Sequence, residues 1–152
     1  MPSHAGQIAF VGGHKQAGEE NAWVVAQREF EEETHLSREI IEFQGYLPLA
    51  MTARLQPIVP VVAKLKIPTA QFLQEVKSNG EWDDILAYPW SELTVEDRWE
   101  YAMRHGYGSS PFMFHTIRSG TYLPIEKNLK PHLLWGATAS MVWMLLNKYF
   151  SK

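Results

Sequence analysis

The stretch REFEEE at residues 28–33 places four glutamates and one arginine within six positions. The surrounding pattern predicts a helix over residues 22–34, because Ala22, Ala26 and Phe30 recur four apart and form one apolar stripe. Asn21 is the expected N-cap, since its side chain can accept a hydrogen bond from the first turn. The acidic stretch therefore lies on the exposed part of an amphipathic helix.

Three of the glutamates share one side of this helix. At about 100° per residue, Glu29, Glu32 and Glu33 fall within a sector of about 100°. Glu31 falls outside the sector and is expected to be solvated, and Arg28 is expected to pair with a nearby acid. Hard divalent cations prefer such oxygen ligands. The sector thus indicates a metal site, although an acidic, solvated helix face gives the same pattern.

A glycine pair precedes the helix. Gly12 and Gly13 let the backbone pass close to a ligand, and the bare carbonyl of Gly12 could bind a metal. His14 and Lys15 follow directly, where either could contact a phosphate, and solvated side chains remain the alternative. The glycine pair and the acidic helix are weak signals separately, and their fixed spacing makes them a strong one.

Together these residues resemble the Nudix box, G-x5-E-x7-R-E-U-x-E-E-x-G-U, where U is a bulky aliphatic residue. Glu20 to Arg28 has the seven-residue spacing, which leaves one extra residue between Gly13 and Glu20. Phe30 and His35 replace the aliphatic residue and the glycine of the box, and the carboxylates match. His35 is then expected to end the helix in a left-handed conformation, at a cost of about 1 kcal/mol.

Further stretches are similar to the coenzyme A diphosphatase branch of that family. Residues 4–13 resemble H-x-G-x-[VI]-x-F-P-G-G with Val11 in place of proline, and the extra residue after Gly13 is also typical of the branch. Residues 133–139 resemble the branch's I-W-G-x-T-A helix, and residues 81–90 its E-V-x-E-[VI]-F-x-V-P-L segment. The resemblance implies an enzyme that cleaves coenzyme A or a derivative to 3′,5′-ADP and 4′-phosphopantetheine. ADP-ribose or a nucleotide sugar is the alternative substrate.

The resemblance also implies roles for individual residues. Glu32, Glu33 and Arg28 are the expected catalytic residues. Mg²⁺ or Mn²⁺ would be held by Glu29, Glu32, Glu33 and the Gly12 carbonyl, and Lys15 and His14 would contact substrate. Either Glu32 or a downstream acid such as Glu81 could take the proton.

Composition limits the other classes of protein. The chain has 152 residues, 45% hydrophobic and 20% charged, which is ordinary for a globular domain. It lacks cysteine, which excludes disulfides and Cys-based zinc sites. The net charge of −3 argues against nucleic-acid binding. Without a signal peptide or a membrane-spanning run, a cytoplasmic location is expected.

The chain-wide pattern predicts one α/β or α+β domain over residues 1–152, with a mixed sheet between helices as in the Nudix fold. Strands are expected at residues 7–11, 82–88 and 110–117, and residues 45–66 contain two strand-like pieces, the second at residues 57–65. Short helices are expected at residues 69–77 and within residues 90–103, and Asn79 with Gly80 indicates a turn. The last helix is expected over residues 131–149, with residues 133–146 as its buried apolar part and Trp135 and Trp143 on nearly one face.

Members of the resembled branch carry additional strands before residue 4. Without them, Ile8, Phe10 and the strand at residues 57–65 are expected to expose an edge and an apolar patch. A homodimer would cover both, and could bring Arg54 or Arg118 of one copy to the site of the other. A truncated member that only binds a nucleotide or a partner is the alternative.

Overall fold

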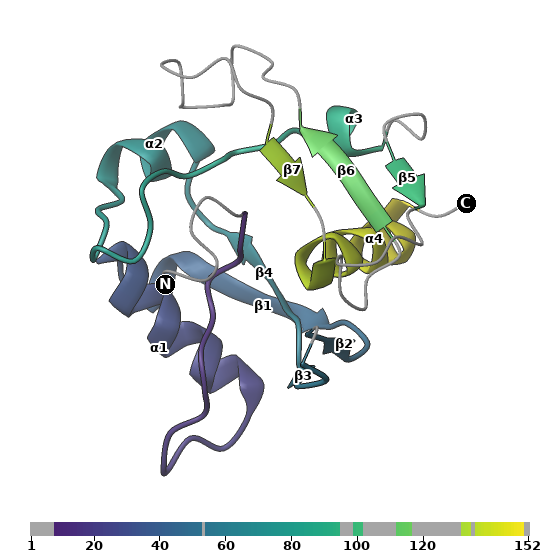
Figure 1. Ribbon diagram of the computed structural model, residues 1–152. Helices are drawn as coiled ribbons and strands as arrows, with labels where there is room; N and C mark the ends of the chain where they lie inside the picture. Colours follow the sequence, from purple (N-terminus) through teal and green to yellow (C-terminus); the bar gives the residue numbers. More distant parts are fainter. Residues whose placement is uncertain are drawn as a thin grey trace. The chain divides into compact units, whose positions relative to one another are not determined.

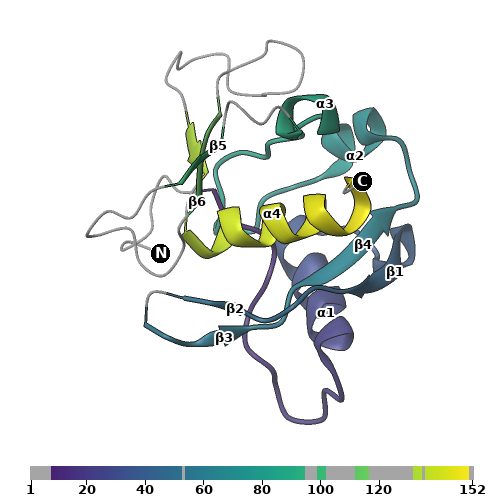
Figure 2. The same ribbon diagram turned by 90° about the vertical axis from the view of Figure 1, so that its right-hand side faces the viewer.

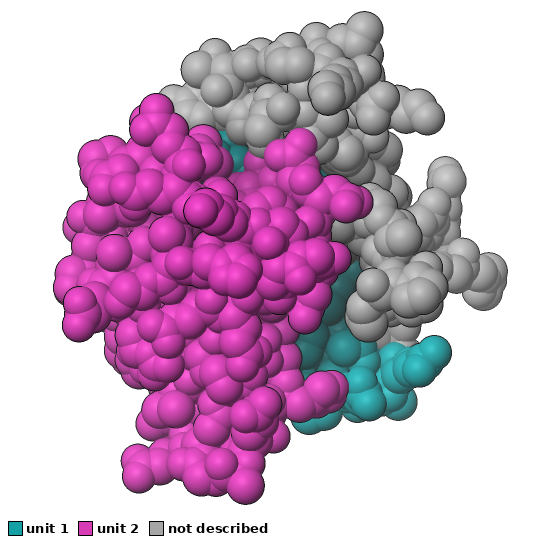
Figure 3. Space-filling model, turned by 90° about the vertical axis from the view of Figure 1, so that its left-hand side faces the viewer, with its two compact units in different colours: residues 1–9, 47–59, 86–152 teal, residues 10–46, 60–85 magenta. Residues whose placement is uncertain are grey.

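The computed structural model describes residues 8–52, 54–94, 99–101, 112–116, 132–134 and 136–150. The chain divides into two compact units, which Figure 3 draws in teal and magenta. Unit 1 comprises residues 1–9, 47–59 and 86–152, and unit 2 comprises residues 10–46 and 60–85. The acidic helix and the loop before it at residues 12–20, called the glycine loop below, belong to unit 2.

Unit 2 combines helices with a two-stranded antiparallel sheet (Figure 1). Its elements in chain order are α1 (Ala22–Thr34), the 3₁₀ turn η2 (Arg38–Ile40), β1 (Ile41–Tyr46), β4 (Val61–Leu65) and α2 (Thr69–Glu75). β1 and β4 pair from Ile41 opposite Leu65 to Tyr46 opposite Val61, with an irregularity between Phe43 and Gly45.

Helix α1 begins and ends where the sequence predicts. The side chain of Asn21 accepts a hydrogen bond from the Val24 N–H at 3.0 Å. At the other end His35 has φ 60° and ψ 24°, and its N–H donates to the Glu31 carbonyl at 3.0 Å. His35 therefore ends α1 in the left-handed conformation that was expected of it.

Buried side chains hold α1 within unit 2. Val25, Phe30 and Thr34 are buried, and the ring of Phe30 stacks on Phe72 of α2 with centroids 6.4 Å apart. The Thr34 hydroxyl donates to the Phe30 carbonyl at 2.6 Å and accepts from the Leu36 N–H at 3.2 Å, so this buried polar group is satisfied. The opposite side of α1 is left for the carboxylates.

Unit 1 contains the C-terminal helix and the remaining strands (Figure 2). Its elements are β2 (Ala50–Met51), β3 (Pro57–Ile58), α3 (Trp90–Leu93), β5 (Trp99–Tyr101), β6 (Phe112–Thr116), β7 (His132–Leu134) and α4 (Gly136–Phe150). β2 pairs with β3, and β5, β6 and β7 form a three-stranded sheet in that order. Both sheets are antiparallel.

The core of unit 1 lies along α4. Its buried members are Leu134, Ala139, Val142 and Leu146. Four partly buried residues pack against this cluster: Ile8, Tyr88, Leu93 and Trp99. Ile8 is thus largely covered, which corrects the expectation that it faces water. In the described segments no helix combines the length and apolarity that a bilayer crossing requires.

The α+β class predicted from the sequence is confirmed. The paired strands in the described segments are all antiparallel and form three small sheets. The expected helices at residues 69–77 and within residues 90–103 are present as α2 and α3, and β6 lies within the strand expected at residues 110–117.

Two predicted strands are wrong. Residues 8–11 form no strand and pair with none of the described strands; Gln7 lies outside the described residues. Residues 82–88 also form no strand. Here the side chain of Asp84 accepts from the Ile85 N–H at 2.9 Å, a local bond that competes with a sheet ladder.

Three boundaries differ from the prediction. The single strand expected at residues 57–65 is split into β3, which pairs with β2, and β4, which pairs with β1. Pro60 lies between the two strands. Strand β1 covers residues 41–46, and only its last two residues lie in the stretch where a strand was expected. The helix expected over residues 131–149 begins only at Gly136, because the φ of 66° at this glycine is not helical. Leu134 therefore belongs to β7. Trp135 lies outside the described residues.

Candidate active site

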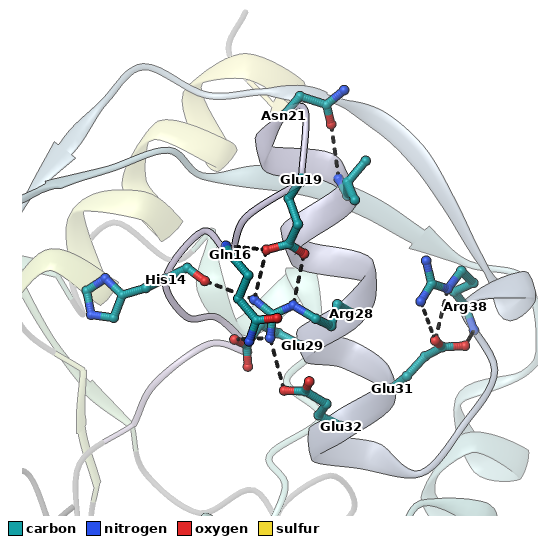
Figure 4. Close-up of polar contacts among 10 residues, drawn as sticks. His14, Gln16, Glu19, Asn21, Arg28, Glu29, Glu31, Glu32 and Arg38 are labelled. Atoms are coloured by element: carbon teal, nitrogen blue, oxygen red, sulfur yellow. Dashed lines mark hydrogen bonds and ion pairs between the residues drawn. The ribbon is translucent and has the colours of Figure 1, made fainter.

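Arg28 is the centre of the polar network on α1 (Figure 4). Its guanidinium donates to Glu19 at 2.9 and 3.2 Å, to Glu29 at 2.9 Å and to Glu32 at 3.1 Å. A further bond of 2.9 Å runs to the backbone carbonyl of His14. The predicted pairing of Arg28 with nearby acids is therefore confirmed, and one side chain links the helix to the loop before it.

These bonds determine the ionisation of the pair at the centre. The hydrogen bond from Arg28 lowers the pKa of Glu19, the Gln16 N–H adds to this effect, and the charge of Lys15 contributes least. The same interaction with Glu19 raises the pKa of Arg28. Both groups are therefore held in their charged forms.

Glu19, and not Glu20, is the loop glutamate that contacts Arg28. Glu20 is exposed, whereas the Glu19 side chain is only 10% exposed. In the resemblance to the box, Glu20 is matched to the box glutamate through its seven-residue spacing to Arg28. The spacing G-x5-E counted from Gly13 selects Glu19 instead, and that half of the pattern is the signal for the contact.

The glycine loop lies directly against α1. A Cβ added to Gly13 would overlap the carboxylate of Glu29, so any other residue here would require the Glu29 side chain to shift from its position. A Cβ on Gly12 would meet nothing within 4 Å, and the Gly12 N–H donates to the Glu33 Oε1 at 3.3 Å. The structure thus brings both glycines to two of the three predicted metal-binding glutamates.

Glu33 lies among other acids. Partial burial raises its pKa, the hydrogen bond from the Gly12 N–H opposes that shift, and the charges of Glu81, Glu29 and Glu32 raise the pKa further. Four carboxylates therefore act on one another at this end of α1. Such mutual repulsion is relieved when a cation binds among the oxygens.

The donor set fits a hard divalent cation in its chemistry, since carboxylate oxygens are what Mg²⁺ and Mn²⁺ prefer. In the part of the chain that the structure describes, no three acidic or histidine side chains are grouped so that they could hold a metal ion. The reason is visible in the bonds, because Glu29 and Glu32 are turned to Arg28 and Glu33 to Gly12.

Glu31 is bound on the other side of the helix. Its carboxylate accepts from Arg38 at 2.6 and 2.9 Å and from the Arg38 backbone N–H at 2.9 Å, and these bonds lower its pKa. Its separation from the Glu29, Glu32 and Glu33 sector is as predicted. The expectation that it is merely solvated is wrong, because Ser37 and Arg38 turn back after His35 and present the guanidinium to it.

The predicted substrate-binding residues lie in the same loop. His14 and Lys15 are exposed, and the His14 carbonyl is the one bound by Arg28. Arg54 is exposed in the segment between β2 and β3 of unit 1, and Arg118 lies outside the described residues.

The C-terminal end of α1 carries contacts that the sequence did not reveal. The Trp82 indole N–H donates to the Glu33 carbonyl at 2.7 Å, and the Lys77 N–H donates to the Thr34 carbonyl at 3.1 Å. Both satisfy carbonyls that a helix end otherwise leaves without a partner. No periodicity connects residues 49 positions apart, so the pattern offered no signal for them.

The family model described as NUDIX domain matches residues 2–105. The match includes the glycine loop, the whole of α1 and the segment that holds Trp82. Comparisons with curated proteins and with solved structures find no match.

Proposed function

We propose that this chain, which belongs to the NUDIX domain family, cleaves coenzyme A or a derivative of it. As a member of that family it is a hydrolase of diphosphate bonds in nucleoside diphosphate-linked compounds. In the proposed reaction, the oxygen of a water molecule attacks one phosphorus and the P–O bond to the bridging oxygen breaks. The products are 3′,5′-ADP and 4′-phosphopantetheine.

The support for coenzyme A as substrate comes from the sequence on both sides of α1. Residues 4–13, 81–90 and 133–139 resemble three separate motifs of the coenzyme A diphosphatase branch. With Glu19 as the box glutamate, the extra residue falls between Glu19 and Arg28 and not after Gly13, so it gives no support to the branch.

One observation carries the assignment of the site. The backbone of Gly13 lies so close to the Glu29 carboxylate that a larger residue would displace that carboxylate, and the Gly12 N–H is bound to Glu33 four residues along the same helix. This arrangement brings the backbone of Gly12 and Gly13 to the carboxylates of Glu29 and Glu33. Glu29, Glu32, Glu33 and the Gly12 carbonyl would hold Mg²⁺ or Mn²⁺. The cation would offset the diphosphate charge and lower the pKa of a bound water.

The chain's own residues supply the rest of the chemistry. Arg28 orients Glu29 and Glu32 through charge-assisted bonds, and its position is in turn held by Glu19. Glu32 is the proposed proton acceptor, because its side chain is 52% exposed and is therefore open to a substrate water. Glu81 is the second candidate for that role, being exposed and near enough to Glu33 to influence its pKa. His14 and Lys15 would contact the substrate phosphates.

A competition assay tests the substrate. The protein receives coenzyme A, ADP-ribose and a nucleotide sugar at equal concentration with saturating Mg²⁺, and the products are separated by mass. We expect 3′,5′-ADP to accumulate fastest. Faster release of AMP from ADP-ribose or of a sugar phosphate would replace coenzyme A by the alternative substrate. Binding without any turnover would favour the alternative of a nucleotide-binding protein.

A homodimer is also proposed. Phe10 is 54% exposed and Val59 is 46% exposed, and in the described part of the chain β1 and β4 pair only with each other. Exposed apolar side chains and unpaired strand edges both favour association of two copies. Sedimentation at low micromolar concentration tests this proposal, and a monodisperse monomer would contradict it.

A further inference from the structure

The segment of residues 77–82 is bound to α1 at both of its ends. Lys77 donates its backbone N–H to the Thr34 carbonyl at 3.1 Å, and Trp82 donates its indole N–H to the Glu33 carbonyl at 2.7 Å. The indole is partly buried, which favours retention of this bond. Trp82 therefore holds Glu33 through the Glu33 backbone carbonyl, and the side chain of the same residue carries one of the proposed metal-binding carboxylates.

The segment between these two anchors is internally closed. The Ser78 hydroxyl donates to the Trp82 carbonyl at 2.6 Å and accepts from the Gly80 N–H at 3.0 Å. The Asn79 side chain accepts from the Glu81 N–H at 3.0 Å, and Gly80 has φ 98°. Such local bonds make a compact turn whose residues move together. A shift of the Trp82 anchor is thus passed to Glu81.

Glu81 precedes Trp82 directly and is exposed. The charge of Glu81 contributes to the raised pKa of Glu33. We propose that Trp82 is a positioning residue of the active site, which holds the Glu33 backbone in place and keeps the Glu81 carboxylate beside that of Glu33. This inference rests on the proposed function only in placing Glu33 among the residues that bind the cation.

The test compares two identical substitutions on different parts of unit 2. Trp82→Phe removes the indole N–H and keeps an aromatic ring. Trp23→Phe is the matched control, because Trp23 lies on α1 and its ring faces Phe43 at 5.3 Å, away from the Glu33 carbonyl. Free Mn²⁺ is measured by electron paramagnetic resonance during titration, which needs no substrate.

We expect Trp82→Phe to weaken Mn²⁺ binding by about tenfold, because substitution of residues that hold metal ligands in place commonly has an effect of this size. Trp23→Phe should leave Mn²⁺ binding unchanged. Glu81→Gln should weaken binding in the parent and have a much smaller effect in the Trp82→Phe background, because the two act through one interaction. Equal weakening by both tryptophan variants, or additive effects of Trp82→Phe and Glu81→Gln, would overturn the proposal. So would a Trp82→Phe protein that binds Mn²⁺ like the parent.

A second variant covers the case in which Trp82→Phe does not fold. Ser78→Ala leaves the indole intact and opens the turn that restrains Trp82. It should also weaken Mn²⁺ binding, and unchanged binding would count against the proposal. Failure of the proposed substrate gives a different result, in which coenzyme A is not cleaved while the Mn²⁺ pattern among the variants persists.

Discussion

Arg28 and Glu19 form a two-bond ion pair, with Nε to Oε2 at 2.9 Å and Nη2 to Oε1 at 3.2 Å. The side chains are only 17% and 10% exposed, so the pair is well shielded from water for a surface interaction. Glu19 comes from the loop and Arg28 from α1. The pair therefore determines where the glycine loop lies relative to the carboxylates.

Glu19→Gln should lower kcat/KM by at least about tenfold, because a neutral amide no longer holds Arg28 in position for Glu29 and Glu32. Steady-state hydrolysis at saturating Mg²⁺ measures the loss. Glu20→Gln is the control, since Glu20 is exposed, and it should behave like the parent. A larger loss from Glu20→Gln than from Glu19→Gln would show that Glu20, and not Glu19, is the loop glutamate on which activity depends.

Gly13→Ala should lower activity by about 10²-fold, because the added methyl overlaps the Glu29 carboxylate and one of them must move. Gly12→Ala makes the same chemical change one residue earlier, where nothing lies within 4 Å of the new carbon. It should retain activity within a few-fold. Comparable rates for the two variants would show that the close approach of Gly13 to Glu29 has no role in catalysis.

Leu146→Ala should lower the free energy of unfolding by about 2–5 kcal/mol, because Leu146 is buried in the core of unit 1. Thermal or denaturant unfolding gives the measurement. Asn147→Ala, at the exposed neighbouring position, should change stability little. If both variants unfold like the parent, the buried side of α4 has been assigned incorrectly.

Local signals on α1 were sufficient to predict much of this site. An apolar stripe, an N-cap at Asn21 and a left-handed residue at His35 are properties of consecutive residues, and the helix has those bounds. The clustering of Glu29, Glu32 and Glu33 follows from helix geometry alone. The role of Arg28 as a partner for nearby acids follows from the same geometry and from charge.

Contacts between distant residues were not predictable in this way. Asn79 and Gly80 indicated the turn at residues 77–82, but the bond from Trp82 to Glu33 depends on how that turn packs on α1, and the strand predicted from Trp82 onward is wrong. The choice between Glu19 and Glu20 depends on how the loop folds back on Arg28, which spacing left open. The split between β3 and β4 depends on different partner strands.

The most direct test of the central claim is the rate of hydrolysis by Glu33→Gln at saturating Mg²⁺. The substitution keeps the side chain's shape and removes a negative charge from the carboxylates on α1, so a loss of about 10²-fold or more is predicted. Glu31→Gln is the matched control, because Glu31 is bonded to Arg38 on the other side of the helix, and this variant should retain activity. A Glu33→Gln protein that is folded and active within a few-fold of the parent would contradict the claim.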